Sequence, residues 1–362
     1  MKRPIINTIG LIRNQERVAL RLQIDLQLLS ELKMPLLSEI EELEDPTSPW
    51  KNIRFFPRKH FRLLIEGLND AHKTIFSKEF TNQNYGQFLI TVPSFYRNEK
   101  LVAFKLYETS VMPTVQCFLG HFFPLDLPQF PKIIVSDFDK TLVETRYSTP
   151  RELWRSLRSP LKRFPTLENS LNLLKSHLQQ GHIPFIVSAS PHFYESAIRD
   201  WLYEHHIFTS NIFLKDYRKI FSIVDQELTP KDITKQSYYK LLHLIEIMMM
   251  CGHAQDLVLM GDGFESDLFI YTIFQRILSK KADPHHLWRM VLSRKEFNLT
   301  SNQQATFLLK VYELTARLAS RPAINVKIHI RCKVNMINEI YQKDLGDKEL
   351  NKLKELVHFY EN

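Results

Sequence analysis

Three short apolar runs in the second half of the chain are each followed at once by polar side chains. Residues 133–135 lead into Ser-Asp-Phe-Asp-Lys-Thr, residues 185–187 into Ser-Ala-Ser-Pro, and residues 257–260 into Gly-Asp-Gly. Short, fully apolar runs are typical of buried parallel strands, whose C-terminal ends present polar groups at one edge of a sheet. We therefore predict that the three polar segments meet in space.

Helical and strand patterns alternate around these runs. Helices are predicted from Glu168 to Gly181, over 193–203 and over 233–249, and strands over 183–187, 257–260 and 326–330. This alternation indicates an α/β fold with a doubly wound parallel sheet. Residues 282–321 read as a helical insertion before the last strand, and a final helix is predicted over 346–360.

The first third of the chain has a different texture. Leu22, Leu26, Leu29 and Leu32 recur at helical spacing, so residues 1–48 are predicted to form an N-terminal helical segment. Alternating segments at 88–92, 101–107 and 114–119 predict a small β-rich, sandwich-like domain over 49–130. The α/β domain then occupies 131–362.

Composition limits the class of protein and the cellular compartment in which we expect it. With 44% apolar and 24% charged residues, the 362-residue chain has ample material for packed cores. Three widely spaced cysteines favour a reducing compartment, and we find neither a signal peptide nor a transmembrane stretch. We therefore expect a cytoplasmic protein, either free or in peripheral contact with a membrane. The net charge of +8 suits an anionic partner or serves only solubility.

The aspartates of the first polar segment predict a metal site. Asp137 and Asp139 are two residues apart and can converge on one face, where their charges repel unless a cation or a shared proton offsets them. Mg2+ prefers oxygen ligands. We expect them from Asp137, from the carbonyl oxygen of Asp139 and from Asp262, with Asp267 either a ligand or just behind the ligands.

The same residues suit phosphoryl transfer. Asp137 is the natural nucleophile, and Asp139 would protonate the leaving oxygen and then activate water. Thr141 would fix the loop by a local hydrogen bond, and Ser188 would bind phosphate oxygens. A lysine should balance the charge. Lys235 is our first choice, with Lys231 and Lys240 as the alternatives.

Together the three segments resemble the haloacid dehalogenase superfamily of phosphohydrolases. The stretch from Phe185 to Glu195, with its Ser-Ala-Ser-Pro, and the stretch 261–271 are similar to the catalytic domain of actin-patch-type phosphatidate phosphatases, as is 328–331. The resemblance implies a Rossmann-like catalytic domain acting on a lipid phosphate. The chain departs from the family at Lys140, where an acid is common, and the resemblance does not include the first 45 residues.

A basic segment bears on the substrate. Its basic residues, interleaved with Trp154 and leucines, are Arg146, Arg151, Arg155, Arg158, Lys162 and Arg163. Such a segment either rests on an anionic lipid surface or forms an ordinary solvated helix face. Under the first reading Arg146, Arg151 and Arg155, together with Ser190, contact the substrate.

The expected function is thus a Mg2+-dependent phosphatase that works through an aspartyl-phosphate, with phosphatidate or a related lipid phosphate as substrate. Two alternatives stay open. One is the same chemistry on a soluble phosphorylated metabolite, nucleic-acid end or protein, although nucleic acid is not our expected partner. The other is a non-catalytic lipid- or protein-binding module, against which the full set of aspartates argues.

Overall fold

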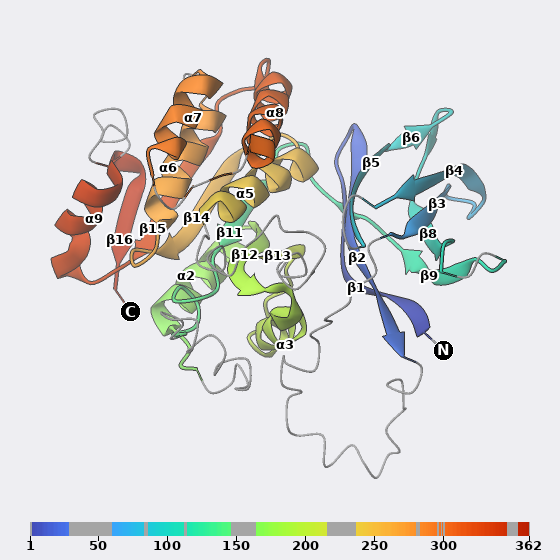
Figure 1. The fold of residues 1–362 in the computed structure, drawn as a ribbon, viewed down its shortest axis with the longest axis horizontal. Helices are drawn as coiled ribbons and strands as arrows, with labels where there is room; N and C mark the ends of the chain where they lie inside the picture. The colour runs from blue at the N-terminus through green and yellow to red at the C-terminus, as the bar shows by residue number, and fades with distance from the viewer. Residues whose placement is uncertain are drawn as a thin grey trace, which may run out of the picture. The chain divides into compact units, whose positions relative to one another are not determined.

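The computed structural model divides the chain into two compact units, and the described residues pass from one unit to the other between Gln129 and Phe130. Figure 1 shows both units as ribbons. The structure describes residues 2–28, 60–82, 86–111, 114–145, 164–215, 237–279, 283–294, 297, 299, 301–345 and 354–361. Every structural statement below concerns these residues.

The first unit contains two four-stranded sheets and a short hairpin. One sheet has the order β10-β1-β2-β5, formed by Leu125–Asp126, Lys2–Arg13, Arg17–Leu28 and Gln87–Pro93. The other has the order β4-β3-β8-β9, formed by Thr74–Thr81, Arg62–Leu68, Ala103–Glu108 and Cys117–Phe122. The hairpin pairs β6 (Phe95–Tyr96) with β7 (Glu99–Lys100).

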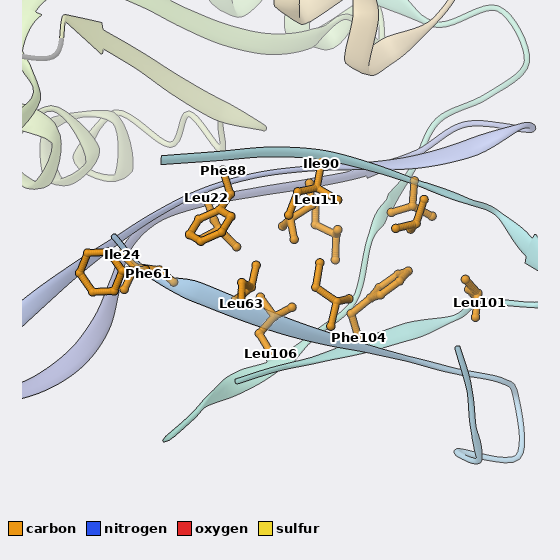
Figure 2. Close-up of a cluster of buried hydrophobic side chains, with 14 residues drawn as sticks. Leu11, Leu22, Ile24, Phe61, Leu63, Phe88, Ile90, Leu101, Phe104 and Leu106 are labelled. Atoms are coloured by element: carbon orange, nitrogen blue, oxygen red, sulfur yellow. The ribbon is translucent and has the colours of Figure 1, made fainter. Parts of the chain in front are cut away.

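The two sheets share one apolar core. Alternate residues of β2 and β5, such as Leu22 and Ile90, face alternate residues of β3 and β8, such as Leu63 and Leu106 (Figure 2). Such interdigitation of two inner faces is how sheets pack into a sandwich. Strands β3 to β10 lie within residues 49–130, for which β-rich structure was expected, and β1 and β2 add strands from before that range.

The helical prediction for the N-terminal segment is wrong where the structure describes it. Residues 17–28 form strand β2, which pairs antiparallel with β1 and β5. Val18, Leu20, Leu22 and Ile24 are buried at a spacing of two residues, the period of a strand. Leu22 and Leu26 are four residues apart, which fits either period, and the helical period was the wrong choice. The remainder of that prediction, residues 29–48, lies outside the described residues.

The second unit is a mixed α/β structure built on one six-stranded parallel sheet. Its order is β13-β12-β11-β14-β15-β16, formed by Asn211–Lys215, Ile183–Pro191, Lys132–Ser136, Asp256–Asp262, Asn325–Arg331 and Val357–Tyr360. All five strand pairings are parallel. The strands predicted at 183–187, 257–260 and 326–330 are therefore confirmed.

Helices connect these strands. The α-helices are α2 (Glu168–Gln179), α3 (Glu195–Glu204), α5 (Ser237–Cys251), α6 (Asp267–Leu278), α7 (Pro284–Leu292), α8 (Ser301–Leu318) and α9 (Ile337–Leu345). Short 3-10 turns are η5 (His192–Tyr194), η8 (Val334–Met336) and η9 (Lys354–Leu356). The helical content predicted for 282–321 is present as α7 and α8. No helix in the described ranges is long and apolar enough to span a membrane.

The end of the chain differs from its prediction. Residues 357–360 are strand β16, paired parallel with β15, where a helix was expected over 346–360. Their sequence, Val-His-Phe-Tyr, is rich in residues that favour strands, and pairing with β15 supplies the backbone partners. The part of the predicted helix before residue 354 lies outside the described residues.

The strand order positions the site. From β11 the chain adds β12 and then β13 on one side, and it later adds β14, β15 and β16 on the other side. The C-terminal ends of β11 and β14 therefore border the crevice that forms where the order of a parallel sheet reverses, the usual place for a ligand.

Candidate active site

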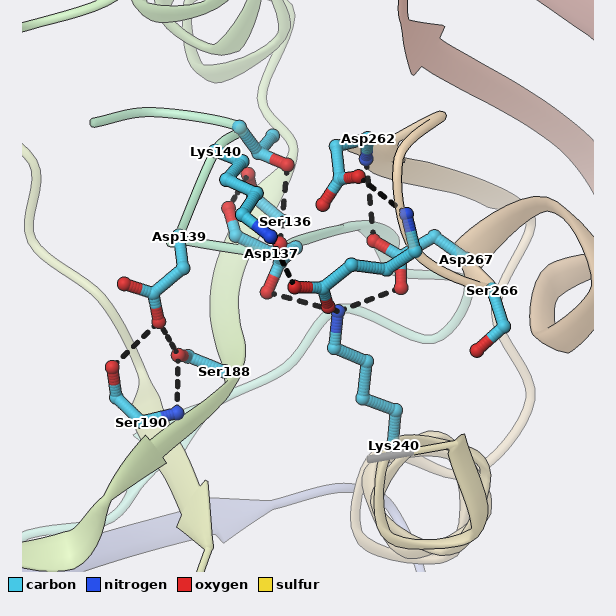
Figure 3. Close-up of polar contacts among 12 residues, drawn as sticks. Ser136, Asp137, Asp139, Lys140, Ser188, Ser190, Lys240, Asp262, Ser266 and Asp267 are labelled. Atoms are coloured by element: carbon cyan, nitrogen blue, oxygen red, sulfur yellow. Dashed lines mark hydrogen bonds and ion pairs between the residues drawn. The ribbon is translucent and has the colours of Figure 1, made fainter. Parts of the chain in front are cut away.

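The polar segments predicted to meet do meet, at the C-terminal ends of β11, β12 and β14. Asp137 follows β11 directly, Ser188 and Ser190 lie in the last part of β12, and Asp262 ends β14. Asp267 is the first residue of α6. Figure 3 shows two neighbouring groups, one of Asp137, Asp262 and Asp267 with Lys240 of α5 entering from below, and one of Ser188 and Ser190 beside Asp139.

The loop after β11 is held in one shape by its own hydrogen bonds. The backbone N–H of Asp137 donates to the carbonyl of Met260 (2.8 Å), which ties the loop to β14, and Leu142 N–H donates to Phe138 O (2.9 Å). Lys140 has a φ of 59°, in the left-handed region that non-glycine residues seldom adopt. Thr141 Oγ1 donates to Asp137 Oδ2 (3.2 Å), the local bond expected of it.

Asp139 lies apart from the other aspartates, with a different set of partners. Its Oδ2 accepts hydrogen bonds from Ser188 Oγ (2.6 Å) and Ser190 Oγ (2.5 Å). The N–H of Ser190 donates to Ser188 Oγ (2.9 Å), which orients that hydroxyl (Figure 3). Burial raises the pKa of Asp139, while the two serine hydroxyls oppose part of that shift.

Asp137, Asp262 and Asp267 form a compact carboxylate trio. One oxygen from each lies within 4.8 Å of the others, and the side chains are buried. The ammonium of Lys240 binds two members of this trio, since its Nζ lies 2.6 Å from Asp267 Oδ1 and 3.3 Å from Asp137 Oδ1. The same Nζ is 3.4 Å from Glu265 Oε2.

The loop between Asp262 and Asp267 is folded around the Asp262 carboxylate. Asp262 Oδ1 accepts hydrogen bonds from the N–H groups of Phe264 (2.6 Å) and Glu265 (2.9 Å). Asp267 Oδ2 accepts from the N–H of Asp262 (3.2 Å). Gly261 permits this approach, because a Cβ there would lie 2.5 Å from Asp267 Oδ2. The glycine next to the aspartate thus has a steric cause.

Negative charge exceeds positive charge in the described site. Burial raises the pKa of Asp137 and Asp267, and burial together with Glu265 and Asp267 raises that of Asp262 to about 8. Burial would also lower the pKa of Lys240, but Asp137, Asp267 and Glu265 together hold it above the usual range, so its ammonium stays charged. Lys240 and Lys140 together offset only two of the four negative charges that the trio and Glu265 carry when all are ionised.

The donor atoms fit a hard divalent cation. Asp262 Oδ2 is buried and accepts no hydrogen bond from the described residues, and Asp137 Oδ1 accepts none either, its one partner being the Lys240 ammonium 3.3 Å away in an ion pair. Buried polar atoms seldom stay without partners, so unsatisfied carboxylate oxygens in one cluster mark a place for a positive ion. Oxygen ligands are those that Mg2+ and Ca2+ take. The carboxylate of Asp139 bonds to serines and is not among the three clustered ligands.

Several predicted residues lie outside the described part of the chain. They are Lys231, Lys235, Arg146, Arg151 and Arg155, together with the other basic residues of 146–163. Of the three lysines considered for the site, the structure describes only Lys240, and it places that lysine in the trio.

Sequence reasoning missed Glu265 and could not explain Lys140. The two are partners, with Lys140 Nζ 3.1 Å from Glu265 Oε1. Burial would raise the pKa of Glu265, but Lys240 and Lys140 together hold it below its usual range. Two features of the sequence could have indicated this pair. Glu265 is an acid that lies between Asp262 and Asp267, and Lys140 is a lysine where the resembled family commonly has an acid.

A comparison with known protein families matches the part of the chain that contains the site. Residues 132–281 match the family model described as phosphatidate phosphatase APP1, catalytic domain. The match identifies this part of the chain as a phosphatase catalytic domain. No curated protein matches the chain.

Similarity to solved structures is weak. A chain of the Pnkp1/Rnl/Hen1 complex is 16% identical, with 42% of this chain and 48% of that chain covered and a TM-score of 0.28. The chain thus spans about half the length of that structure. A candidate HAD-like phosphatase from Mesorhizobium loti is 11% identical, with 53% and 91% covered and a TM-score of 0.28. TM-scores of this size do not establish a shared fold.

Proposed function

We propose that this chain, with its phosphatase catalytic domain at residues 132–281, is a Mg2+-dependent phosphomonoester hydrolase whose substrate is a lipid phosphate of the phosphatidate type. The six-stranded sheet is then the doubly wound sheet of a haloacid dehalogenase-type fold, which its strand order supports. The family match supports the substrate class.

One observation carries the reaction mechanism, namely that Asp137 and Asp139 have separate environments. Asp137 faces Lys240 and the other two carboxylates of the trio, whereas Asp139 is bonded to Ser188 and Ser190. Two carboxyl groups whose surroundings differ in this way can take different roles in one reaction. Asp137 is suited to be the nucleophile and Asp139 the acid and base.

In the first step an oxygen of Asp137 attacks phosphorus, and the bond from phosphorus to the substrate's alcohol oxygen breaks. Asp139 gives its proton to that oxygen, and its burial favours the protonated form that this step requires. In the second step water attacks the phosphoryl group on Asp137, Asp139 takes the water proton, and phosphate leaves with Asp137 restored.

The surrounding residues hold these groups in place. Ser188 and Ser190 orient the carboxyl of Asp139, and Thr141 orients that of Asp137. Lys240 keeps Asp137 close to Asp267 while offsetting part of their charge. Asp137, Asp262 and Asp267 would hold Mg2+, which supplies the remaining positive charge for the phosphoryl oxygens.

A substrate panel tests the proposal. Purified protein is assayed for phosphate release from dioctanoyl phosphatidate, glycerol 3-phosphate, a nucleoside monophosphate and a phosphoserine peptide, each with Mg2+ or with EDTA. We expect release with Mg2+, highest for dioctanoyl phosphatidate, and none with EDTA. Release that persists in EDTA contradicts the metal assignment, and a soluble phosphate as the best substrate contradicts the lipid assignment.

Peripheral contact with an anionic membrane remains a further part of the proposal. It depends on the basic residues Arg146, Arg151 and Arg155, which the structure does not describe. Reversing the charges of Arg151, Arg155 and Arg158 should weaken binding to anionic vesicles and spare hydrolysis of a small chromogenic phosphate. Equal loss of both would give the segment a structural role.

A further inference from the structure

The side chains that would react are closed to solvent, while one large apolar side chain beside them is exposed. Asp137, Asp262 and Asp267 are at most 1% exposed, whereas Phe264, two residues after Asp262, is 41% exposed. A substrate whose phosphate reaches the trio must leave the rest of its structure at the rim of the site.

Backbone contacts fix the position of Phe264. Its N–H donates to Asp262 Oδ1 (2.6 Å), so the residue is tied to one carboxylate of the trio. The preceding Gly263 donates its N–H to Arg331 O (2.9 Å). A Cβ on Gly263 would lie 2.6 Å from Ile340 Cδ1, which shows how closely the loop packs against α9. The loop is therefore held from behind, and Phe264 projects from a fixed base.

The ring of Phe264 also has a charged neighbour. The guanidinium carbon of Arg331 lies 5.3 Å from the ring centroid, within the range of a cation–π contact. Arg331 Nε donates to the carbonyl of Lys140 (2.6 Å), which anchors the guanidinium to the loop that carries Asp137. Arg331 has no carboxylate partner among the described residues, so its other N–H groups are available to an acceptor.

We propose that Phe264 and Arg331 form a platform at the rim of the carboxylate site that selects phosphomonoesters whose alcohol carries apolar groups. The Phe264 ring contacts the apolar part of the alcohol, and the guanidinium of Arg331 donates to an oxygen near the phosphate. This inference rests on the proposed phosphatase function.

The test compares two substrates that share a head group. Dioctanoyl phosphatidate and glycerol 3-phosphate differ only in the acyl chains, so the ratio of their kcat/KM values isolates what the acyl chains contribute to kcat/KM. Phe264→Ala should lower this ratio fivefold to tenfold, roughly the effect of losing part of a phenyl contact. Phe264→Leu should restore most of it. Arg331→Gln should also lower the ratio, because the ring loses its support.

Leu309→Ala is the matched control, since Leu309 is 68% exposed on α8 and has no place in the proposed site. It should leave the ratio and both rates at wild-type values. A Phe264→Ala ratio equal to that of the wild type overturns the platform, and so does a loss that is the same for both substrates, which marks a structural residue.

Binding separates failure of the platform from failure of the phosphatase proposal. Calorimetric titration of both phosphates into Asp137→Asn, and into Asp137→Asn combined with Phe264→Ala, needs no turnover. If the wild type hydrolyses neither phosphate but Phe264→Ala selectively weakens binding of dioctanoyl phosphatidate, the phosphatase proposal fails and the platform stands. If hydrolysis occurs and binding shows no selective loss, the platform fails alone.

Discussion

Lys240 shows how much of the site depends on one side chain. It is 2% exposed, and it pairs with Asp137 and Asp267 while approaching Glu265. Desolvation opposes a buried ammonium, so only the surrounding carboxylates keep it charged, and they in turn depend on it.

Lys240→Met should therefore destabilise the protein. Removing one partner of a buried charged cluster typically costs about 3–5 kcal/mol of unfolding free energy. The measurement is urea denaturation at pH 7.5 in EDTA, with Lys333→Met, an exposed lysine on the same unit, as the control. A loss below about 1 kcal/mol, within the range of ordinary surface substitutions and exposed ion pairs, would show that the cluster does not need this cation.

The choice among the three lysines shows how far the sequence alone predicts the individual residues of the site. A lysine before the third strand was predicted on charge alone, and Asp137, Asp262 and Asp267 were predicted by type and spacing. Which lysine enters the site depends on where α5 begins and which of its faces meets the sheet. Those properties are set by packing, so Lys240 could not be separated from Lys235 in advance.

Among the elements, α2, β15 and β16 are joined by a row of histidines. The ring of His177 on α2 lies 5.4 Å from that of His329 on β15, and His329 stacks on His358 of β16 at 5.3 Å. His182 adds a ring 4.9 Å from His177. Burial, with the neighbouring histidines and Lys327, lowers the pKa of both His177 and His329 to about 4.

This row predicts a loss of stability in acid. Between pH 6.5 and about 4 the unfolded chain binds protons that folded His177 and His329 do not, so unfolding free energy falls as pH falls. The contribution is complete above pH 6.5. His177→Leu should reduce the drop in Tm between pH 6.5 and 4.5, and the exposed His285→Leu should leave it unchanged. An equal drop in wild type and His177→Leu contradicts this role.

Whether an element was predicted correctly depends on whether its residue pattern fits only one of the helical and strand periods or both of them. The run 257–260 is apolar throughout and too short for a helix, and it is buried as β14. Residues 17–28 carry leucines at a spacing that suits both periods, and only pairing with β1 and β5 decides for a strand. Strand β16 forms because β15 offers an open edge, which four residues cannot reveal by themselves.

At the scale of the molecule, the chain joins a β-sandwich unit to an α/β unit with a phosphatase catalytic domain. The parallel sheet brings together carboxylates that are 130 residues apart in sequence, from Asp137 to Asp267, and buries them where charge must be offset. The order of apolar runs predicted this convergence. Substrate selectivity depends on rim residues such as Phe264, which carry no pattern in sequence.

The central claim is that Asp137 is the nucleophile of a Mg2+-dependent phosphatase. Its most direct test is phosphate release from dioctanoyl phosphatidate in Mg2+ by the wild type and by Asp137→Asn, with circular dichroism to show that both are folded. We expect release by the wild type and, since losing a nucleophile removes the covalent route, at least a roughly 1,000-fold lower rate for Asp137→Asn. A folded Asp137→Asn protein that releases phosphate at the wild-type rate would contradict the account.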